Sequence, residues 1–147
     1  MLDPISNIEV RLVVYGENYW EIAKPYIEIA LKESCNYGVI DRIGVLIKSR
    51  RYRLFLIYDP VCLLGAAVTC TEEGGLGEYW YNILYLYILP MTPTDFGVRD
   101  YVVSRLEVDA IKIGCTHIHF LSARNGGLRL ARRYGYEKRF VEYAKKL

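Results

Sequence analysis

Two histidines in an apolar segment are the first residues of this 147-residue chain whose types and spacing could support chemistry. His117 and His119 stand two positions apart, so on a β-strand their side chains would share one face. Such a pair can bind a metal ion, accept a proton, contact a substrate or complete the packing. No third metal ligand stands at a suitable spacing beside them, and we therefore predict no metal site.

Three glutamates, Glu72, Glu73 and Glu78, flank a glycine-rich segment just before a long apolar run. A carboxylate near an acyl carbon can take the proton from an attacking amine. We therefore name Glu78 as the candidate general base, with Glu72 and Glu73 as alternatives. The structural interpretation, which stays open, is that all three are solvated residues of a turn.

Basic residues are concentrated in the last part of the chain. The formal net charge of the whole chain is +2, but the segment from Arg124 to Leu147 holds eight Lys and Arg residues against two acidic residues. Tyr134, Tyr136 and Tyr143 are interleaved with these charges. The pattern is compatible with a phosphate-bearing ligand, with a solvated helix face, or with a nucleic acid.

Hydrophobic periodicity predicts one mixed α/β domain over residues 1–147. Period-two alternation predicts strands, and apolar spacings of three and four predict helices. The predicted order is β-α-α-β-β-β-α-β-α-β, a mixed sheet flanked by helices on both faces. The predicted strands are Asn7–Tyr15, Tyr52–Tyr58, Cys62–Thr71, Glu78–Leu89, Thr116–Ser122 and Tyr136–Tyr143. The predicted helices are Asn18–Ser34, Val39–Ile47, Asp95–Ile113 and Gly126–Tyr134, and a turn is predicted at Glu72–Gly77.

Composition and simple sequence signals predict a globular chain with a cytoplasmic location and without a membrane helix. Hydrophobic residues make up 52% and charged residues 24%, which is a globular balance. No run approaches the roughly 20 apolar residues of a membrane helix, so no membrane partner is predicted. The four cysteines are unclustered and the start of the chain carries Asp3 without a long apolar core, so we expect free thiols and a cytoplasmic location. The 14 tyrosines suit packing or a surface for protein partners.

The element order resembles the GCN5-related N-acetyltransferase (GNAT) family over nearly the whole chain. Three segments carry the resemblance. They are Leu64–Ala67, similar to the family's third strand; Leu86–Pro90 with Gly97, similar to its cofactor-binding strand and loop; and Leu130–Tyr136, similar to its closing segment. The resemblance implies an acyl-CoA-dependent N-acyltransferase that uses acetyl-CoA and an amine acceptor, either a small molecule or a protein.

The resemblance also implies a set of site residues. In the family, a strand and the start of the following helix hold CoA, because helix N–H groups bind the pyrophosphate. The corresponding residues here are Tyr87, Ile88, Leu89, Gly97, Val98, Arg99 and Asn125. Tyr134 is the candidate acid that protonates the departing thiolate, because Ala131 stands at the family's usual tyrosine position.

The chain departs from the family pattern at Thr94, Arg99 and Ala131. It is therefore identified as a degenerate member, similar in style to small GNAT-like proteins encoded by phages or viruses. Two alternatives to an enzyme stay open. One is a catalytically inactive structural or interaction protein, for example a phage virion component found in the host cytoplasm or the virion. The other is a nucleic-acid binder or modifier that uses the basic carboxyl-terminal segment.

Overall fold

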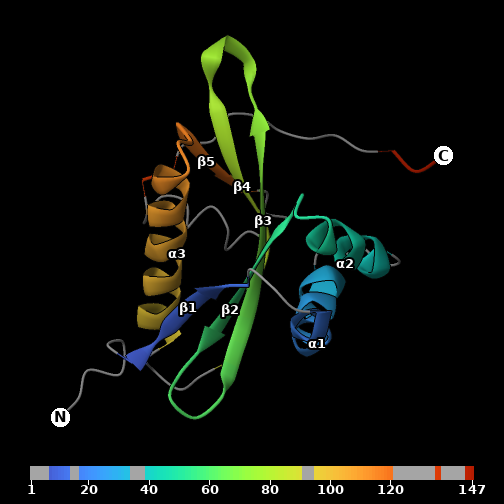
Figure 1. Cartoon of the computed structure of the whole chain (residues 1–147), viewed down its shortest axis with the longest axis vertical. Coiled ribbons are helices and arrows are strands. Elements are labelled where there is room, and N and C mark those ends of the chain that lie inside the picture. Colours follow the sequence, from blue (N-terminus) through green and yellow to red (C-terminus); the bar gives the residue numbers. More distant parts are fainter. Residues whose placement is uncertain (1–6, 14–16, 34–38, 91–94, 121–134, 137–144) are drawn as a thin grey trace.

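The computed structural model describes residues 7–13, 17–33, 39–90, 95–120, 135–136 and 145–147 (Figure 1). The described strands are β1 (Glu9–Leu12), β2 (Arg53–Tyr58), β3 (Leu63–Glu73), β4 (Tyr79–Ile88) and β5 (His117–Phe120). The described helices are α1 (Glu17–Glu33), α2 (Ile40–Lys48) and α3 (Asp95–Lys112), and a short turn, η2 (Gly75–Gly77), joins β3 to β4.

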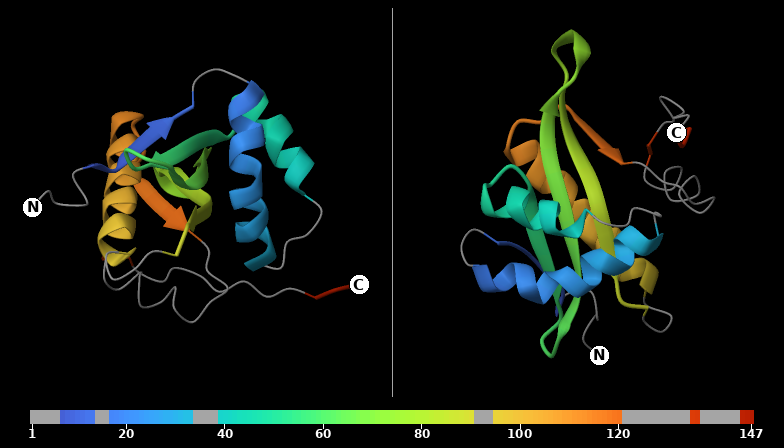
Figure 2. Two further views of the ribbon diagram at one scale, coloured as in Figure 1. Left: turned by 90° about the horizontal axis from the view of Figure 1, so that it is seen from below. Right: turned by 90° about the vertical axis from the view of Figure 1, so that its right-hand side faces the viewer.

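The described strands form one mixed sheet in the order β1-β2-β3-β4-β5. Neighbours are antiparallel from β1 to β4, whereas β5 runs parallel to β4. Two parallel neighbours need a crossover, and α3 supplies it. Helix α3 lies on one face of the sheet, and α1 and α2 lie on the other (Figures 1 and 2). The predicted mixed sheet between helices is confirmed.

Two hydrophobic clusters, one on each face, hold the helices to the sheet. Successive strand residues point to opposite faces, so β2 and β3 contribute to both clusters. The cluster beneath α3 includes Phe55, Ile57, Ala67, Val102 and Leu106. The cluster beneath α1 and α2 includes Trp20, Ile27, Leu54, Leu56, Ala66 and Val68. Each fully buried aliphatic side chain contributes about 1.5–3 kcal/mol relative to exposure.

A partly buried polar cluster links the last turns of α3 to β2 and β4. Asp109 of α3 receives two hydrogen bonds from the Arg53 guanidinium, at 2.7 Å from Nη2 and 3.2 Å from Nε. It receives a third from the Tyr81 hydroxyl at 2.9 Å. Tyr81 is fully buried, and burial raises the pKa of its phenol. The cluster therefore ties one helix to two strands that are distant in sequence.

The β3–β4 hairpin differs from the prediction. Glu72 and Glu73 continue β3 and pair with Trp80 and Tyr79, so the predicted turn at Glu72–Gly77 is too long at its start. The two-strand ribbon projects beyond the rest of the sheet (Figure 1). Sequence propensity misses this extension because cross-strand pairing with aromatic residues outweighs the turn preference of the acids and glycines.

The other predicted elements agree with the structure within a few residues over the part of the chain that it describes. Pro25 lies inside α1 and does not end it.

The predicted helix Gly126–Tyr134 and almost all of the predicted strand Tyr136–Tyr143 lie outside the described residues. None of the described helices combines the length and apolar character needed to cross a bilayer.

Candidate active site at the β4 bulge

Strand β4 contains a bulge at Leu84. Val68 pairs with Tyr85, and Thr69, the next residue of β3, pairs with Ile83, so Leu84 has no partner on β3. The bulge changes which residues face α3. Tyr81 and Ile83 pack on the α3 side before it, and Leu86 and Ile88 do so after it. Such bulges occur often beside active sites because they release backbone groups and redirect side chains.

Within the described residues, the pairing of β4 with β5 runs as far as Ile83, just before this bulge. The four matched pairs run from Trp80–His117 to Ile83–Phe120. Beyond Ile83, no residue of the described part of the chain pairs with this side of β4. Backbone N–H and C=O groups on such an edge can bind an extended ligand as a further strand would.

The other side of β4 is closely packed against β3. Leu89 N–H donates to the Leu64 carbonyl at 2.7 Å. A Cβ at Gly65 would lie 2.0 Å from the Tyr87 carbonyl oxygen, so only glycine fits there. The close contact fixes the backbone of the β4 segment that follows the bulge.

The first turn of α3 lies beside the end of β4. Ile88 and Val98 belong to the same hydrophobic cluster and are 7% and 1% exposed. The side chains of these two predicted cofactor residues are therefore inside the protein, and only their backbone could contact a ligand. Gly97 and Arg99 are half-buried. The exposed N–H groups of a helix start favour an anion at this position.

Tyr87 and Leu89 complete the predicted cofactor strand. The ring of Tyr87 packs against Tyr26 of α1, with centroids 5.9 Å apart, and the Tyr26 hydroxyl donates to the Leu63 carbonyl at 3.1 Å. Of the predicted cofactor residues, the structure thus brings Ile88 and Val98 together, and the binding role of the whole set stays a prediction. Asn125 and Tyr134 lie outside the described residues, as does most of the basic carboxyl-terminal segment.

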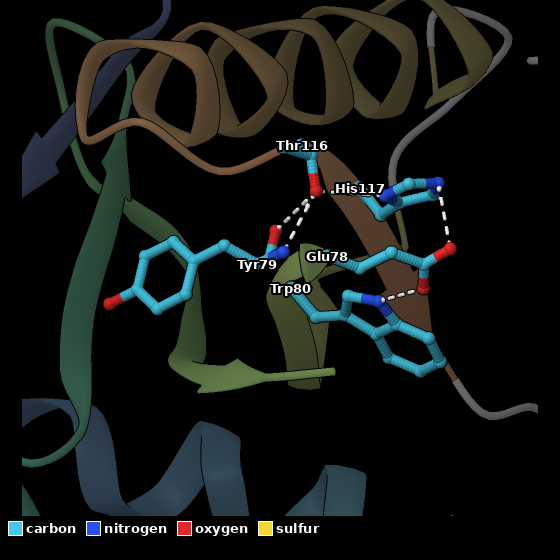
Figure 3. A network of polar contacts seen from close by, with 5 residues as sticks. All are labelled: Glu78, Tyr79, Trp80, Thr116 and His117. Carbon is cyan, nitrogen blue, oxygen red and sulfur yellow. Dashed lines mark hydrogen bonds and ion pairs between the residues drawn. The ribbon is translucent and has the colours of Figure 1, made fainter. Parts of the chain in front are cut away.

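Glu78 lies at the far end of β4 in a separate polar network (Figure 3). Its Oε2 accepts a hydrogen bond from Trp80 Nε1 at 2.6 Å, and its Oε1 lies 3.6 Å from Nε2 of His117. Thr116 Oγ1 lies 2.9 Å from Nδ1 of the same histidine and accepts from Tyr79 N at 2.8 Å. Glu78 precedes Leu84 by six positions, about 20 Å along a strand. The structure does not bring Glu78 to the bulge, and its role as general base stays a prediction.

A second polar network lies nearer the bulge, across β3, β4 and β5. Asn82 is 6% exposed, and its Nδ2 donates to Glu72 Oε1 at 2.8 Å and to Cys70 Sγ at 3.8 Å. Its Oδ1 lies 2.9 Å from His119 Nδ1. An ionised carboxylate only accepts hydrogen bonds, so the Asn82 amide must present its nitrogen to Glu72 and its oxygen to His119. His119 Nδ1 must then carry a proton, and the neutral ring has its lone pair on Nε2.

Burial lowers the pKa of His119, and the charge of Glu72 partly offsets this by raising it. The neutral imidazole is therefore the main form at neutral pH. Trp80 packs beside this ring, with centroids 5.4 Å apart. As predicted, His117 and His119 lie on one face of the strand. In the described part of the chain, no three or more His, Cys, Asp or Glu residues form a group that could hold a metal ion.

Several solved structures with a similar fold are acetyltransferases. A GCN5-related N-acetyltransferase from Ralstonia eutropha JMP134 superposes with a TM-score of 0.75 and 16% identity, covering 95% of this chain and 98% of that chain. An aminoglycoside acetyltransferase from an uncultured soil metagenomic sample, in complex with sisomicin, superposes with a TM-score of 0.73 and 14% identity, covering 99% of each chain. The fold is that of the GCN5-related N-acetyltransferases.

Another structure with the GNAT fold, an aminoglycoside N-acetyltransferase in complex with CoA, has a TM-score of 0.71 and 11% identity, and 95% of each chain is covered. No protein-family model matches the sequence, and no curated protein matches it either. The GNAT fold is thus evident in three dimensions while the sequence has diverged.

The β4 bulge and the Asn82–His119 contact were not found from the sequence, because neither has a local signal there.

Proposed function

We propose that this chain is an acyl-CoA-dependent N-acyltransferase of the GNAT type with acetyl-CoA as its acyl donor. The observation that carries the proposal is the bulge at Leu84, which follows the last described pair of β4 with β5 and precedes the part of β4 beside the first turn of α3. The GNAT fold of the whole chain supports it. An acyl donor with an extended, amide-bearing arm and a pyrophosphate matches a strand edge that leads to a helix start.

The backbone would supply most of the contacts to the donor. The edge of Tyr87–Leu89, which no described strand pairs with, would bind the amides of the arm, and N–H groups of Gly97–Arg99 would meet the phosphates. The Arg99 side chain would add a charge-assisted hydrogen bond to a phosphate oxygen. A backbone N–H released at Leu84 would polarise the acyl carbonyl, which stabilises charge on its oxygen during attack.

The acceptor would be an amine. A solved structure with this fold is an aminoglycoside acetyltransferase in complex with sisomicin, and another is a ribosomal-protein-alanine N-acetyltransferase from Brucella melitensis biovar Abortus 2308. We therefore propose sisomicin, spermidine, n-butylamine and a short peptide with a free amino terminus as the first acceptors to assay. Release of the free CoA thiol reports turnover with any of them.

Calorimetric titration with acetyl-CoA tests the donor site. We expect saturable binding by the natural chain, loss of binding in Gly97→Trp, and several-fold weaker binding in Arg99→Ala. Arg105→Ala is the matched control, because Arg105 is exposed two turns further along α3 and should leave affinity unchanged. Absence of saturable binding up to millimolar acetyl-CoA would overturn the proposal and would favour a GNAT fold retained without catalysis.

A further inference from the structure

We propose that His119, oriented by Asn82 and Glu72, accepts the proton from the attacking amine. The inference rests on the proposed acyltransferase function and goes beyond it by assigning the base. It replaces the candidate predicted from sequence, Glu78, with a group that the register of three strands places near the bulge.

Position is the first argument. Asn82 and Leu84 stand two positions apart on β4, about 7 Å along the strand, and both lie on the face away from α3. His119 pairs with Asn82 on the neighbouring strand, about 5 Å to the side. An imidazole at this place can reach an amine that attacks an acyl carbon held at Leu84. Glu78 is about three times as far from the bulge along β4.

Orientation is the second argument. The Asn82 amide donates to Glu72 at 2.8 Å, so its oxygen faces Nδ1 of His119 at 2.9 Å. The contact keeps the proton on Nδ1 and leaves Nε2 as the basic atom. Nε2 is shielded from bulk water, so the amine must displace the atoms that cover it. Asn82 and Glu72 act through His119 and are positioning residues.

Charge is the third argument. The titratable groups nearest His119 on this face of the described strands are Cys70 and Glu72 of β3, His117 of β5, and Glu78 just before β4. The tyrosines that share the face, Tyr52, Tyr58, Tyr85 and Tyr87, lie beyond the bulge or at the more distant strand β2. Of the nearest groups, Glu72 raises the pKa of His119, while burial of the ring lowers it. A histidine that is neutral at physiological pH is ready to accept a proton.

The proton transfer balances with the acyl transfer. The amine nitrogen forms a bond to the thioester carbonyl carbon, and the carbon–sulfur bond breaks. The amine proton passes to Nε2 of His119, and the CoA thiolate leaves with the electron pair of the broken bond. The thiolate then takes a proton from the imidazolium or from solvent, which restores neutral His119 and yields an amide and a free thiol.

The first experiment compares His119→Asn with Glu78→Gln, using acetyl-CoA and n-butylamine as probes. Asparagine keeps a donor toward Asn82 but cannot act as a base. We expect kcat to fall on the order of 100-fold to 10,000-fold in His119→Asn, with the acetyl-CoA Kd unchanged. A loss confined to Glu78→Gln, or acetyl-CoA binding by the natural chain without thiol release, would overturn the assignment of His119. Failure to bind acetyl-CoA would instead overturn the proposed function.

The second experiment measures the pH dependence of kcat/KM in Glu72→Gln. The glutamine side-chain oxygen can still accept the hydrogen bond from Asn82, but the negative charge of Glu72, which raises the pKa of His119, is gone. The pKa falls, the basic form persists to lower pH, and the acidic limb of the profile shifts to lower pH. Glu73→Gln is the matched control, since Glu73 is the next residue on β3 and points to the other face. An unshifted limb in Glu72→Gln, or the same shift in both variants, would contradict the proposal.

Discussion

Removal of the Asp109 carboxylate should lower the stability of this protein substantially. Asp109 accepts two hydrogen bonds from Arg53 and one from Tyr81, and the two charged side chains are 15% and 27% exposed. A hydrogen bond to a charged group contributes about 1.5–3 kcal/mol when buried, so the Tyr81 bond counts for about 1.5–2.5 kcal/mol. Because Arg53 is partly exposed, its two bonds together count for only about 1.5 kcal/mol. Asp109→Ala also leaves the buried Tyr81 hydroxyl without this acceptor. We expect the free energy of unfolding to fall by about 3–4 kcal/mol.

Urea unfolding followed by circular dichroism measures the change, and a double-mutant cycle separates its parts. Tyr81→Phe alone should cost about 1–2 kcal/mol, because Asp109 keeps Arg53. The two changes together should cost less than their sum, with a coupling energy of about 1–2 kcal/mol. Asp41→Ala is the control: Asp41 is 92% exposed and lies 3.8 Å from Lys24, so its loss should have a much smaller effect. Additive costs, or a loss below about 1 kcal/mol in Asp109→Ala, would refute the cluster as described.

Two further changes test the backbone of the β3–β4 hairpin. Gly65→Ala places a methyl group against the Tyr87 carbonyl oxygen, so we expect the free energy of unfolding to fall by about 2–3 kcal/mol in urea. We also expect weaker acetyl-CoA binding by calorimetry. An unchanged affinity would show that the donor site does not depend on the backbone geometry of β4. Leu76 is fully exposed with a φ of 61°, so Leu76→Gly should be neutral or stabilise the chain by up to about 1 kcal/mol. A clear destabilisation in the same unfolding assay would show that the leucine side chain makes contacts that the structure does not contain.

The main elements were predictable because their signals are local. Alternation in Asn7–Tyr15 and spacings of three and four in Asn18–Ser34 depend only on which face of a strand or helix must be covered. Ile88 and Val98 share one hydrophobic cluster, as expected for a strand and the next helix along the chain, and the cofactor role of Tyr87–Leu89 and Gly97–Arg99 stays a prediction.

The candidate general base, Glu78, shows what local sequence patterns cannot predict. Glu78 is attractive in the sequence because it stands just before an apolar strand, yet the fold places it about 20 Å from the bulge. Asn82, with no motif around it, is the residue that bridges Glu72 and His119. Its importance depends on which residues of β3 and β5 lie beside it, and strand register is set by pairing along the whole sheet.

By itself, the sequence determined the order of the described helices and strands and the faces they bury, because each follows from residue type and spacing along the chain. Only the tertiary structure decided the bulge at Leu84, the tautomer of His119 and the attachment of α3 through Asp109. Each of these joins residues that are distant in sequence, or depends on a one-residue shift between strands. Such features are decided by the packing of the entire sheet, and no local pattern encodes them.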